Sequence, residues 1–386
     1  MGTREESTTI GKVITCKAAV AWEPKGEFVV QDVQVEPPHA MEVRIKVTHS
    51  SLCRSDVFFW ANEGLAHTFP RIFGHEAAGI VESVGEGITD LRPGDHVLPI
   101  FTGECRECKY CASPKTNLCS KFGVASLETG MKSDGKSRFS VQGKPISRFL
   151  GSTFSEYTVV EYAYVVKINP AAPLDKVCLL GCGVTAGIGA VRKIAQMEAG
   201  ATVAVFGLGT VGLAVVKEAK LQGASRIIGV DNKASKADEG KRFGITDFLN
   251  PDTLNKPVDE EIRELTEGGV DFAFECVGNP NVMATAFESC QDGWGTTIVI
   301  GVAGRATVTI PTRYLLSGRC MKGTLYGGYK PKTDVPELVE QYLRKDLDVE
   351  EFITHNLPFT RINEAFKLLL AGDSLRTVLH FDDIIR

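Results

Sequence analysis

The chain has 386 residues, of which 43% are hydrophobic and 24% are charged. This is the balance of a globular protein with room for two domains and a sizeable core. The formal net charge is -5. Such a charge provides no basic face, so nucleic acid is not an expected partner. Glycine or charged residues interrupt every apolar run well short of a membrane span, so we expect no membrane association.

The N-terminus is polar and acidic from Met1 to Glu6 and lacks the apolar stretch of a secretory signal peptide. The chain also contains 11 cysteines, which would pair in an oxidising compartment. We therefore expect reduced thiols and metal ligands in a cytoplasmic protein.

The first half of the chain is rich in short β-like runs. Residues 17–22, 42–47 and 79–84 indicate strands, and 42–47 alternates apolar with polar residues as a half-buried strand does. A Pro-Gly-Asp turn at 93–95 precedes the apolar run 97–100. No strand here alternates with a helix, so we expect a mostly β, irregular domain.

Four cysteines follow in one short loop, at the spacing C-x2-C-x2-C-x7-C: Cys105, Cys108, Cys111 and Cys119. Four thiolates at this spacing suit a closed tetrahedral zinc site, which has no open coordination position and performs no chemistry. The alternatives are two disulfides or chance clustering. The spacing and the expected reducing compartment both favour zinc.

The pattern changes near residue 184. Residues 211–221 have the apolar spacing of a helix, and four apolar runs are predicted strands: 202–206, 226–230, 272–275 and 297–300. Strands that alternate with helices indicate a parallel, doubly wound sheet. After residue 323 the pattern is mixed again, and the chain ends in a predicted amphipathic helix at 363–370 and a strand at 376–381.

A glycine pattern, G-x-G-x-x-G, lies between the first of these strands and the helix, with glycines at Gly207, Gly209 and Gly212. The glycines would allow a tight turn and close approach of a pyrophosphate to the helix N-terminus. Asp231, at the end of the next strand, would accept hydrogen bonds from the adenosine ribose, which favours NAD over NADP. Lys236 would soften this preference. A glycine turn that serves packing alone is the alternative.

Three further candidate ligands, Cys53, His75 and Cys182, form no local motif, and each alone is more often a buried thiol or histidine. Their surroundings are distinctive: C-R-S-D at 53–56, G-H-E-A-A-G at 74–79, L-G-C-G-V at 180–184, G-L-G-T-V-G at 207–212 and S-L-R-T at 374–377. On these motifs and the four-cysteine loop, the chain resembles the zinc-dependent medium-chain alcohol dehydrogenases over essentially its whole length, and most of all their plant branch.

The resemblance implies an α/β protein with two domains. A GroES-like, mostly β catalytic domain would span 1–183 and 323–386, and a Rossmann NAD-binding domain with a doubly wound parallel sheet would span 184–322. It further implies two zinc ions per chain, NAD, and hydride transfer between NAD and a primary or secondary alcohol or its carbonyl product. Plant relatives are usually cytosolic homodimers, and residues 307–316, with Val308 and Ile310, would supply an edge strand across a two-fold axis.

The resemblance also implies roles for individual residues. Cys53, His75 and Cys182 would bind the catalytic zinc and the four-cysteine loop a structural zinc; Ser55 would pass a proton, Asp56 would orient His75, and Glu76 would lie behind the zinc. The expected coenzyme-binding residues are Arg54, Gly207, Gly209, Val211, Gly212, Asp231, Lys236, Ile300 and Arg376, with the two arginines on the pyrophosphate. Trp60, Phe101, Phe149 and Leu150 would line an apolar substrate pocket, and ordinary core packing is the alternative.

Two positions depart from the family pattern. Phe58 stands where many animal relatives continue the proton relay with a histidine, and Ala186 stands where many relatives have a threonine beside the nicotinamide. A zinc site with bound NAD and a weakened relay supports an alternative hypothesis, a hydroxynitrile lyase like the flax enzyme of this family. It would cleave a cyanohydrin to a carbonyl and cyanide without consuming NAD. A third hypothesis is a non-catalytic binding protein, against which the intact ligand sets argue.

Overall fold

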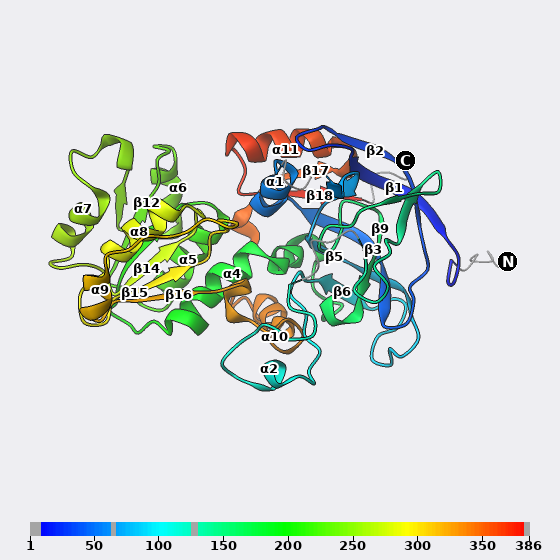
Figure 1. The fold of residues 1–386 in the computed structure, drawn as a ribbon, viewed down its shortest axis with the longest axis horizontal. Coiled ribbons are helices and arrows are strands. Elements are labelled where there is room, and N and C mark those ends of the chain that lie inside the picture. The colour runs from blue at the N-terminus through cyan, green and yellow to red at the C-terminus, as the bar shows by residue number, and fades with distance from the viewer. Residues whose placement is uncertain (1–8, 63–66, 125–129, 382–386) are drawn as a thin grey trace. The chain divides into compact units, whose positions relative to one another are not determined.

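The computed structural model describes residues 9–62, 67–124 and 130–381. The chain divides into two units, Met1–Cys182 with Lys330–Arg386, and Gly183–Tyr329 (Figure 1). The sequence places the second crossing near residue 323. In the structure residues 324–329 still belong to the second unit, where the carbonyl of Gly327 approaches the backbone of Gly189 too closely for any side chain there.

The first unit is built from two largely antiparallel sheets. The five-stranded sheet has the order β4 (Arg71–Ile72), β1 (Ile14–Ala21), β2 (Phe28–Val35), β7 (Phe139–Val141), β8 (Lys144–Ile146). The larger sheet has the order β10 (Val165–Lys167), β6 (His96–Pro99), β5 (Glu76–Val84), β3 (Glu42–Ser51), β18 (Arg376–His380), β17 (Ile353–Pro358), and β9 (Tyr157–Glu161) also pairs with β3. The expected β-rich character of this region is confirmed.

The helices of the first unit are short except for two near the C-terminus. They are α1 (Arg54–Trp60), α2 (Lys109–Ala112), α3 (Leu174–Val177), α10 (Pro331–Leu343) and α11 (Ile362–Ala371). Helix α1 begins with a capping box, because the carboxylate of Asp56 accepts the backbone N–H of Cys53 at 3.0 Å. Helix α11 ends at Gly372, whose φ of 79° is the left-handed conformation that glycine adopts without strain.

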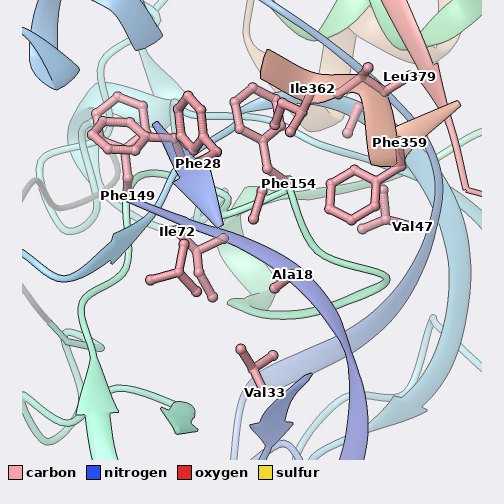
Figure 2. Packing of buried hydrophobic residues seen from close by; sticks show 14 of the residues in the cluster. Ala18, Phe28, Val33, Val47, Ile72, Phe149, Phe154, Phe359, Ile362 and Leu379 are labelled. Atoms are coloured by element: carbon pink, nitrogen blue, oxygen red, sulfur yellow. The ribbon is translucent and has the colours of Figure 1, made fainter. Parts of the chain in front are cut away.

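The main core of the first unit is rich in aromatic rings. Phe28 packs edge-on against Phe73, Phe154 and Phe366, with ring centroids 5.0 to 6.1 Å apart. Figure 2 shows this cluster, where residues of β1, β2 and β3 meet residues of α11 and β18. The C-terminal segment therefore completes the core begun by the N-terminal strands, which is why both chain segments belong to one unit.

The second unit contains a six-stranded, fully parallel sheet. Its order is β13 (Asp247–Leu249), β12 (Arg226–Val230), β11 (Thr202–Phe206), β14 (Phe272–Glu275), β15 (Thr296–Val299), β16 (Cys320–Gly323). Its helices are α4 (Gly183–Gly189), α5 (Thr210–Leu221), α6 (Lys236–Phe243), α7 (Val258–Leu265), α8 (Pro280–Glu288) and α9 (Thr312–Leu316), and α5 and α8 pack against the strands. The predicted alternation of strands and helices is confirmed.

The expected edge strand at 307–316 is wrong over its second half, which forms helix α9. Pro311 precedes the first turn of this helix, and the following residues, Arg313 to Leu316, include good helix formers. Residues 307–311 form no strand within the described chain.

No single described helix is long and apolar enough to cross a membrane; one bent pair of consecutive helices, 174–181 and 183–195, meets the length and composition test only when the two are counted together.

Candidate functional site

Cys53, His75 and Cys182 come together in the first unit from three distant places in the sequence. Cys53 precedes α1, His75 precedes β5, and Cys182 ends the first segment of the unit; all three are buried. The two Sγ atoms are 3.8 Å apart, and Nε2 of His75 is 3.3 Å from Sγ of Cys182. A tetrahedral zinc requires about 3.8 Å between two thiolates and about 3.6 Å between a thiolate and an imidazole nitrogen. The three donors therefore fit a zinc ion with three protein ligands.

Asp56 fixes the orientation of His75. One carboxylate oxygen accepts from Nδ1 of His75 and from the N–H of Gly74, both at 3.1 Å, and the other accepts the N–H of Cys53. Because Nδ1 is held in this way, Nε2 faces the two thiols. The same carboxylate thus starts α1 and sets the geometry of two ligands.

Arg376 connects Glu76 to the ligand cluster. Its Nε and Nη2 donate to the Glu76 carboxylate at 2.6 and 3.0 Å, and Nη2 also lies 3.5 Å from Sγ of Cys53. Sequence reasoning did not find this pair, which joins residues 300 positions apart. The assignment of Arg376 to the coenzyme pyrophosphate stays a prediction, as does that of Arg54, which is exposed at the start of α1.

The charges around the cluster favour a thiolate at Cys53. The pKa of Cys53 lies well below its usual value, because the Cys182 thiol donates to it and Arg376 adds positive charge, which together outweigh burial. Burial raises the pKa of Glu76 above its usual value, and the charge of Arg376 acts in the opposite direction. Burial alone would lower the pKa of His75, but the charge and hydrogen bond of Asp56 raise it well above its usual value.

Ser55 and Phe58 lie on α1, directly after the first ligand. The hydroxyl oxygen of Ser55 is 3.9 Å from Sγ of Cys53, which places it beside the metal donors. Phe58 is 36% exposed, and its ring meets Phe59 edge-on. Solvent therefore reaches the position where a relay histidine would stand.

Two of the predicted pocket residues flank His75 with their rings. The ring centroids of Phe101 and Phe149 lie 5.9 and 6.0 Å from that of His75, both nearly perpendicular to it. Leu150 follows Phe149 and is buried with it in the main core. Trp60 instead donates to the carbonyl of Gly26 at 2.8 Å and packs on Phe366. The pocket role of all four stays a prediction, and the contacts of Trp60 agree with its alternative as ordinary core.

The four cysteines of the loop also converge. The Sγ atoms of Cys105 and Cys111 are 3.9 Å apart, as are those of Cys108 and Cys119, and all four lie within 4.8 Å of one another. These spacings match tetrahedral zinc, and all described cysteines are free thiols rather than disulfides. Backbone N–H groups of Cys108, Cys111 and Phe122 donate to the sulfurs at 3.3 to 3.4 Å, which stabilises thiolate charge.

The start of α10 is tied to this loop, a connection that the sequence did not reveal. Arg106 donates to the carbonyl of Lys332 at 2.7 Å, and Lys330 donates to the carbonyls of Cys111 and Ser113 at 2.5 and 2.8 Å. The carboxylate of Glu104 also accepts the N–H of Thr333. The conformation of the cysteine loop is therefore coupled to that of the first turn of α10, where the chain returns to the first unit.

The glycine pattern forms a tight turn at the N-terminus of α5 in the second unit. Gly207 has a φ of 90°, and a Cβ there would meet the side chain of Val277 at 2.8 Å. A Cβ on Gly212 would lie 1.9 Å from the carbonyl of Gly207, so only glycine fits. Gly209 has open space around its Cα, and Val211 is half-buried in the first turn. This backbone leaves room for a phosphate at the helix end.

Asp231 lies beside this turn. Its Oδ2 accepts the N–H of Leu208 at 2.9 Å, and its Oδ1 accepts the N–H of Lys233. Lys236, at the start of α6, forms an ion pair with Glu239, which competes with any ligand phosphate. Ile300 donates its backbone N–H to the carbonyl of Glu275 at 2.9 Å, at the carboxyl end of the sheet.

Glu275 supports the backbone beside the glycine turn, and sequence reasoning did not find it. Its buried carboxylate accepts the backbone N–H groups of Val277 and Gly278 at 3.0 and 2.7 Å. Val277 is the residue that packs beside Gly207, so Glu275 shapes one side of the glycine turn. A glutamate at the end of a predicted buried strand was the available signal.

Comparison with known proteins gives consistent matches over the whole chain. Residues 39–170 match the alcohol dehydrogenase GroES-like domain, and residues 210–344 match the zinc-binding dehydrogenase domain. The chain is 53% identical over 380 residues to alcohol dehydrogenase 1 of Solanum tuberosum, an alignment covering 98% of this chain and 100% of that one. It is 55% identical over 379 residues to alcohol dehydrogenase class-3 of Oryza sativa subsp. japonica, covering 97% and 99%. Among solved structures, benzyl alcohol dehydrogenase from Acinetobacter calcoaceticus superposes with a TM-score of 0.85 at 28% identity, covering 95% of this chain and 99% of that one.

Proposed function

The chain belongs to the zinc-dependent medium-chain alcohol dehydrogenases, in their plant branch, and on that premise we propose a specific division of work among its residues. It is an NAD-dependent zinc oxidoreductase that acts on small-molecule alcohols and carbonyls. The proposal is that Cys53, His75 and Cys182 hold the zinc at which the alcohol is oxidised. The observation that carries it is the spacing of the three donors, which suits a tetrahedral ion with one position left to a substrate.

When bound, zinc supplies Lewis acidity at the alcohol oxygen, and NAD supplies the hydride acceptor. The residues prepare the site for this chemistry. Asp56 holds His75 so that Nε2 faces the metal position. Arg376 balances the buried negative charge of Glu76 and of the Cys53 thiolate, which allows these two anionic groups to lie close together. Phe101 and Phe149 exclude water from the neighbourhood of His75.

Proton release follows a short route in this proposal. Ser55 accepts the proton of the alcohol and passes it outward, supported by the position of its hydroxyl beside Cys53. Phe58 carries no exchangeable proton, so water at its exposed position receives the proton directly. The last step of proton release therefore depends on solvent, because no histidine is present at this position to accept the proton from Ser55.

The coenzyme site is proposed at the glycine turn of the second unit. Gly207, Gly209 and Gly212 leave the backbone accessible to a pyrophosphate at the start of α5, and the Asp231 carboxylate repels a 2′-phosphate. The pairing of Lys236 with Glu239 supports NAD, because the lysine is already engaged by a carboxylate. The comparisons lend no support to the hydroxynitrile lyase hypothesis, and the named dehydrogenase relatives set aside the non-catalytic one.

A homodimer in the cytoplasm is proposed as the working form. Leu316 is 89% exposed and Leu315 is 49% exposed on α9, and Val302 nearby in sequence is 47% exposed, an apolar display that favours a protein partner. A second copy is the proposed partner, and sedimentation at micromolar concentration would give a monomer mass if this is wrong.

Eleven cysteines and no disulfide among the described ones support a reducing compartment.

The first test is NADH absorbance after zinc-replete protein is mixed with NAD and a panel of primary, secondary and aromatic alcohols, with aldehydes and NADH in reverse. We expect steady turnover with at least one alcohol, and NADP to be used far less well. Absence of turnover in protein that holds two zinc ions per chain would overturn the proposal. Cyanide release from cyanohydrins would be the next assay.

A further inference from the structure

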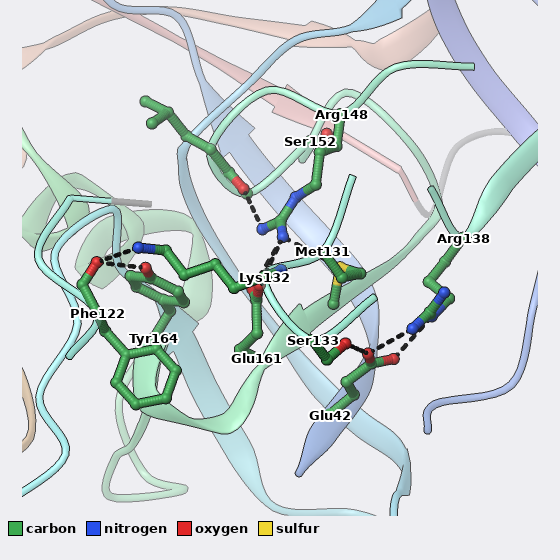
Figure 3. Close-up of polar contacts among 12 residues, drawn as sticks. Glu42, Phe122, Met131, Lys132, Ser133, Arg138, Arg148, Ser152, Glu161 and Tyr164 are labelled. Carbon is green, nitrogen blue, oxygen red and sulfur yellow. Dashed lines mark hydrogen bonds and ion pairs between the residues drawn. The ribbon is translucent and has the colours of Figure 1, made fainter. Parts of the chain in front are cut away.

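Arg148 is a fully buried arginine immediately before two predicted pocket residues. Its Nη1 donates to both carboxylate oxygens of Glu161 at 3.0 and 2.8 Å and lies 3.0 Å from Sδ of Met131. Its Nη2 donates to the carbonyl of Leu150 at 2.8 Å. Figure 3 shows Arg148 reaching between Glu161 and Met131. One guanidinium thus joins β9 to the backbone of the segment that carries Phe149 and Leu150.

The segment that Arg148 holds has an unfavourable backbone. Leu150 and Ser152 both have φ near 48°, in the left-handed region that is unfavourable for residues other than glycine. Ser152 accepts the N–H of Phe149 with its hydroxyl at 2.8 Å, which closes the turn from the other side. Such a conformation persists only where the surroundings impose it, and the donor on the Leu150 carbonyl is one of the groups that impose it.

This turn lies against the residue before the zinc ligand. Thr153 donates its N–H to the carbonyl of Gly74 at 3.1 Å, and Phe154 donates to the carbonyl of Phe73 at 2.9 Å. The ring of Phe149 sits edge-on to His75. A shift of the turn would therefore move the apolar wall relative to His75 without touching a metal ligand.

Burial by itself would raise the pKa of Glu161, but Arg148 and the backbone N–H of Lys132 more than offset it, so the carboxyl titrates below its usual range. The pair is therefore charged inside the core. A buried ion pair stabilises a fold no better than apolar groups of the same volume. The guanidinium, however, has donors left for the Leu150 carbonyl, which apolar groups could not satisfy.

We propose that Arg148, held by Glu161, is a positioning residue that fixes the Phe149–Leu150 wall beside His75 and so determines which alcohols the site accepts by their size. The proposal rests on the function proposed above. Loosening the turn changes the depth of the apolar wall, so long or aromatic alcohols respond more than ethanol. Ethanol leaves most of the wall untouched, and its kcat/KM is the internal reference.

The chain offers a matched control in Arg138. This arginine is equally buried and pairs with Glu42 at 2.9 and 2.7 Å, as Figure 3 shows. It also pairs with Asp134 at 3.0 Å. It lies just before β7, in the five-stranded sheet, and contacts neither Leu150 nor His75 through any of these bonds. Loss of Arg138 should therefore lower stability as loss of Arg148 does, while the preference among alcohols stays the same.

The test compares Arg148→Met, Arg148→Lys, the double variant Arg148→Met with Glu161→Leu, and Arg138→Met. For each, Tm is measured together with the ratio of kcat/KM for hexanol to that for ethanol. We expect this ratio to change about fivefold or more in all three Arg148 variants, and to stay within twofold of the wild type in Arg138→Met. The double variant should recover the Tm that Arg148→Met loses, because it removes the unpaired carboxylate, yet keep the altered ratio.

An unchanged ratio in the folded Arg148 variants, an equal change in Arg138→Met, or a ratio that returns with Tm in the double variant would each overturn the proposal. The preference for size is also measured without turnover. Calorimetry on zinc-replete protein gives the ratio of the binding constants of hexanamide and acetamide, here called the amide ratio. If the wild type oxidises no alcohol, the proposed function fails. The amide ratio then decides the positioning role, which a change supports and an unchanged value overturns.

Discussion

The two candidate metal sites of the first unit differ in how the chain assembles them. The four-cysteine loop draws its donors from one short stretch, residues 105–119, and backbone N–H groups of the same stretch donate to the sulfurs. The second cluster takes its donors from positions 53, 75 and 182, and a separate carboxylate orients the histidine. A local site can be recognised from spacing alone. An assembled site depends on the fold, which leaves it free to keep a coordination position for a substrate.

The largest expected effect comes from removing a donor of the assembled site. Cys53→Ala should lower kcat by at least about 10³-fold, because the site loses the Lewis acidity that supplies several kcal/mol of barrier reduction. Tm should change little, since the surrounding core does not depend on this thiol. Metal analysis should fall from two zinc ions per chain to one, and turnover near the wild-type level would contradict the assignment.

Removing a donor of the local site should lower stability, whereas removing a donor of the assembled site should mainly lower activity. Cys108→Ser should lose the loop zinc and lower the stability by a few kcal/mol, because metal binding there is folding free energy. Cys108 also accepts the N–H of Cys111 at the start of α2, and the loop holds α10. Thermal unfolding and metal analysis measure both effects. Cys320→Ser, outside both clusters, is the control and should keep two zinc ions; a Cys108→Ser protein that does the same would refute the role of the loop.

Much of the fold was accessible to sequence reasoning because buried strands are local patterns. The predicted runs 202–206 and 226–230 coincide with β11 and β12, and the helix at 211–221 coincides with α5 to within one residue. Helix α1 was missed, since it is short and starts from a capping bond between Cys53 and Asp56 rather than from apolar periodicity. The strand expected at 307–316 was wrong, because Val308 and Ile310 suggested a β pattern that ends at Pro311, where helix α9 follows.

The candidate site was accessible only in part. The cysteine loop and the glycine turn follow from spacing, whereas the assembled cluster required a resemblance to a known family. The buried ion pairs escaped both routes, because the partners of Arg376 and Arg148 are set by tertiary packing and not by any motif. Arg376 and Glu76 lie 300 positions apart, and Arg148 and Glu161 are 13 positions apart in an irregular region, so no spacing in the sequence points to either pair.

A third prediction concerns the region that the local site stabilises. Lys332, in the first turn of α10, is buried with its ammonium 2.9 Å from the ring centroid of Tyr162, and burial lowers its pKa from 10.5 to about 7. Between these two values the unfolded chain carries a proton that the folded chain has released, so stability should rise with pH across that window. The destabilisation is fully present below pH 7, because the folded chain must then bury the charge.

Lys332→Met should remove this dependence. We expect the wild type to gain about 2 kcal/mol of stability between pH 7 and pH 8.5 from this group, at roughly 1.4 kcal/mol per pKa unit. The variant's advantage over the wild type should be largest below pH 7, shrink steadily as the pH rises, and disappear only near pH 10.5, the pKa of the unfolded lysine. Urea unfolding at several pH values measures it, with Lys367→Met, an exposed lysine, as the control. Parallel pH profiles of Lys332→Met and the wild type would contradict the prediction, because they would mean that Lys332 has the same pKa in the folded and the unfolded chain.

The smallest effect tests what distinguishes an assembled site from a local one, namely its dependence on a separate orienting group. Asp56→Asn keeps an oxygen for Nδ1 of His75 but loses the negative charge, and its amide cannot accept from Cys53 and Gly74 at both ends. Loss of such a partner typically costs about 10- to 100-fold in activity or metal affinity. We expect the lower end here, with kcat about tenfold down and the zinc of this site released at lower chelator concentration.

Asp247→Asn, which breaks an ion pair with Arg226 in the second unit, should change neither quantity. The loop zinc should resist the chelator equally in all three proteins, because its sulfurs are oriented by their own backbone; release of both ions together would mean that the two sites are not assembled independently.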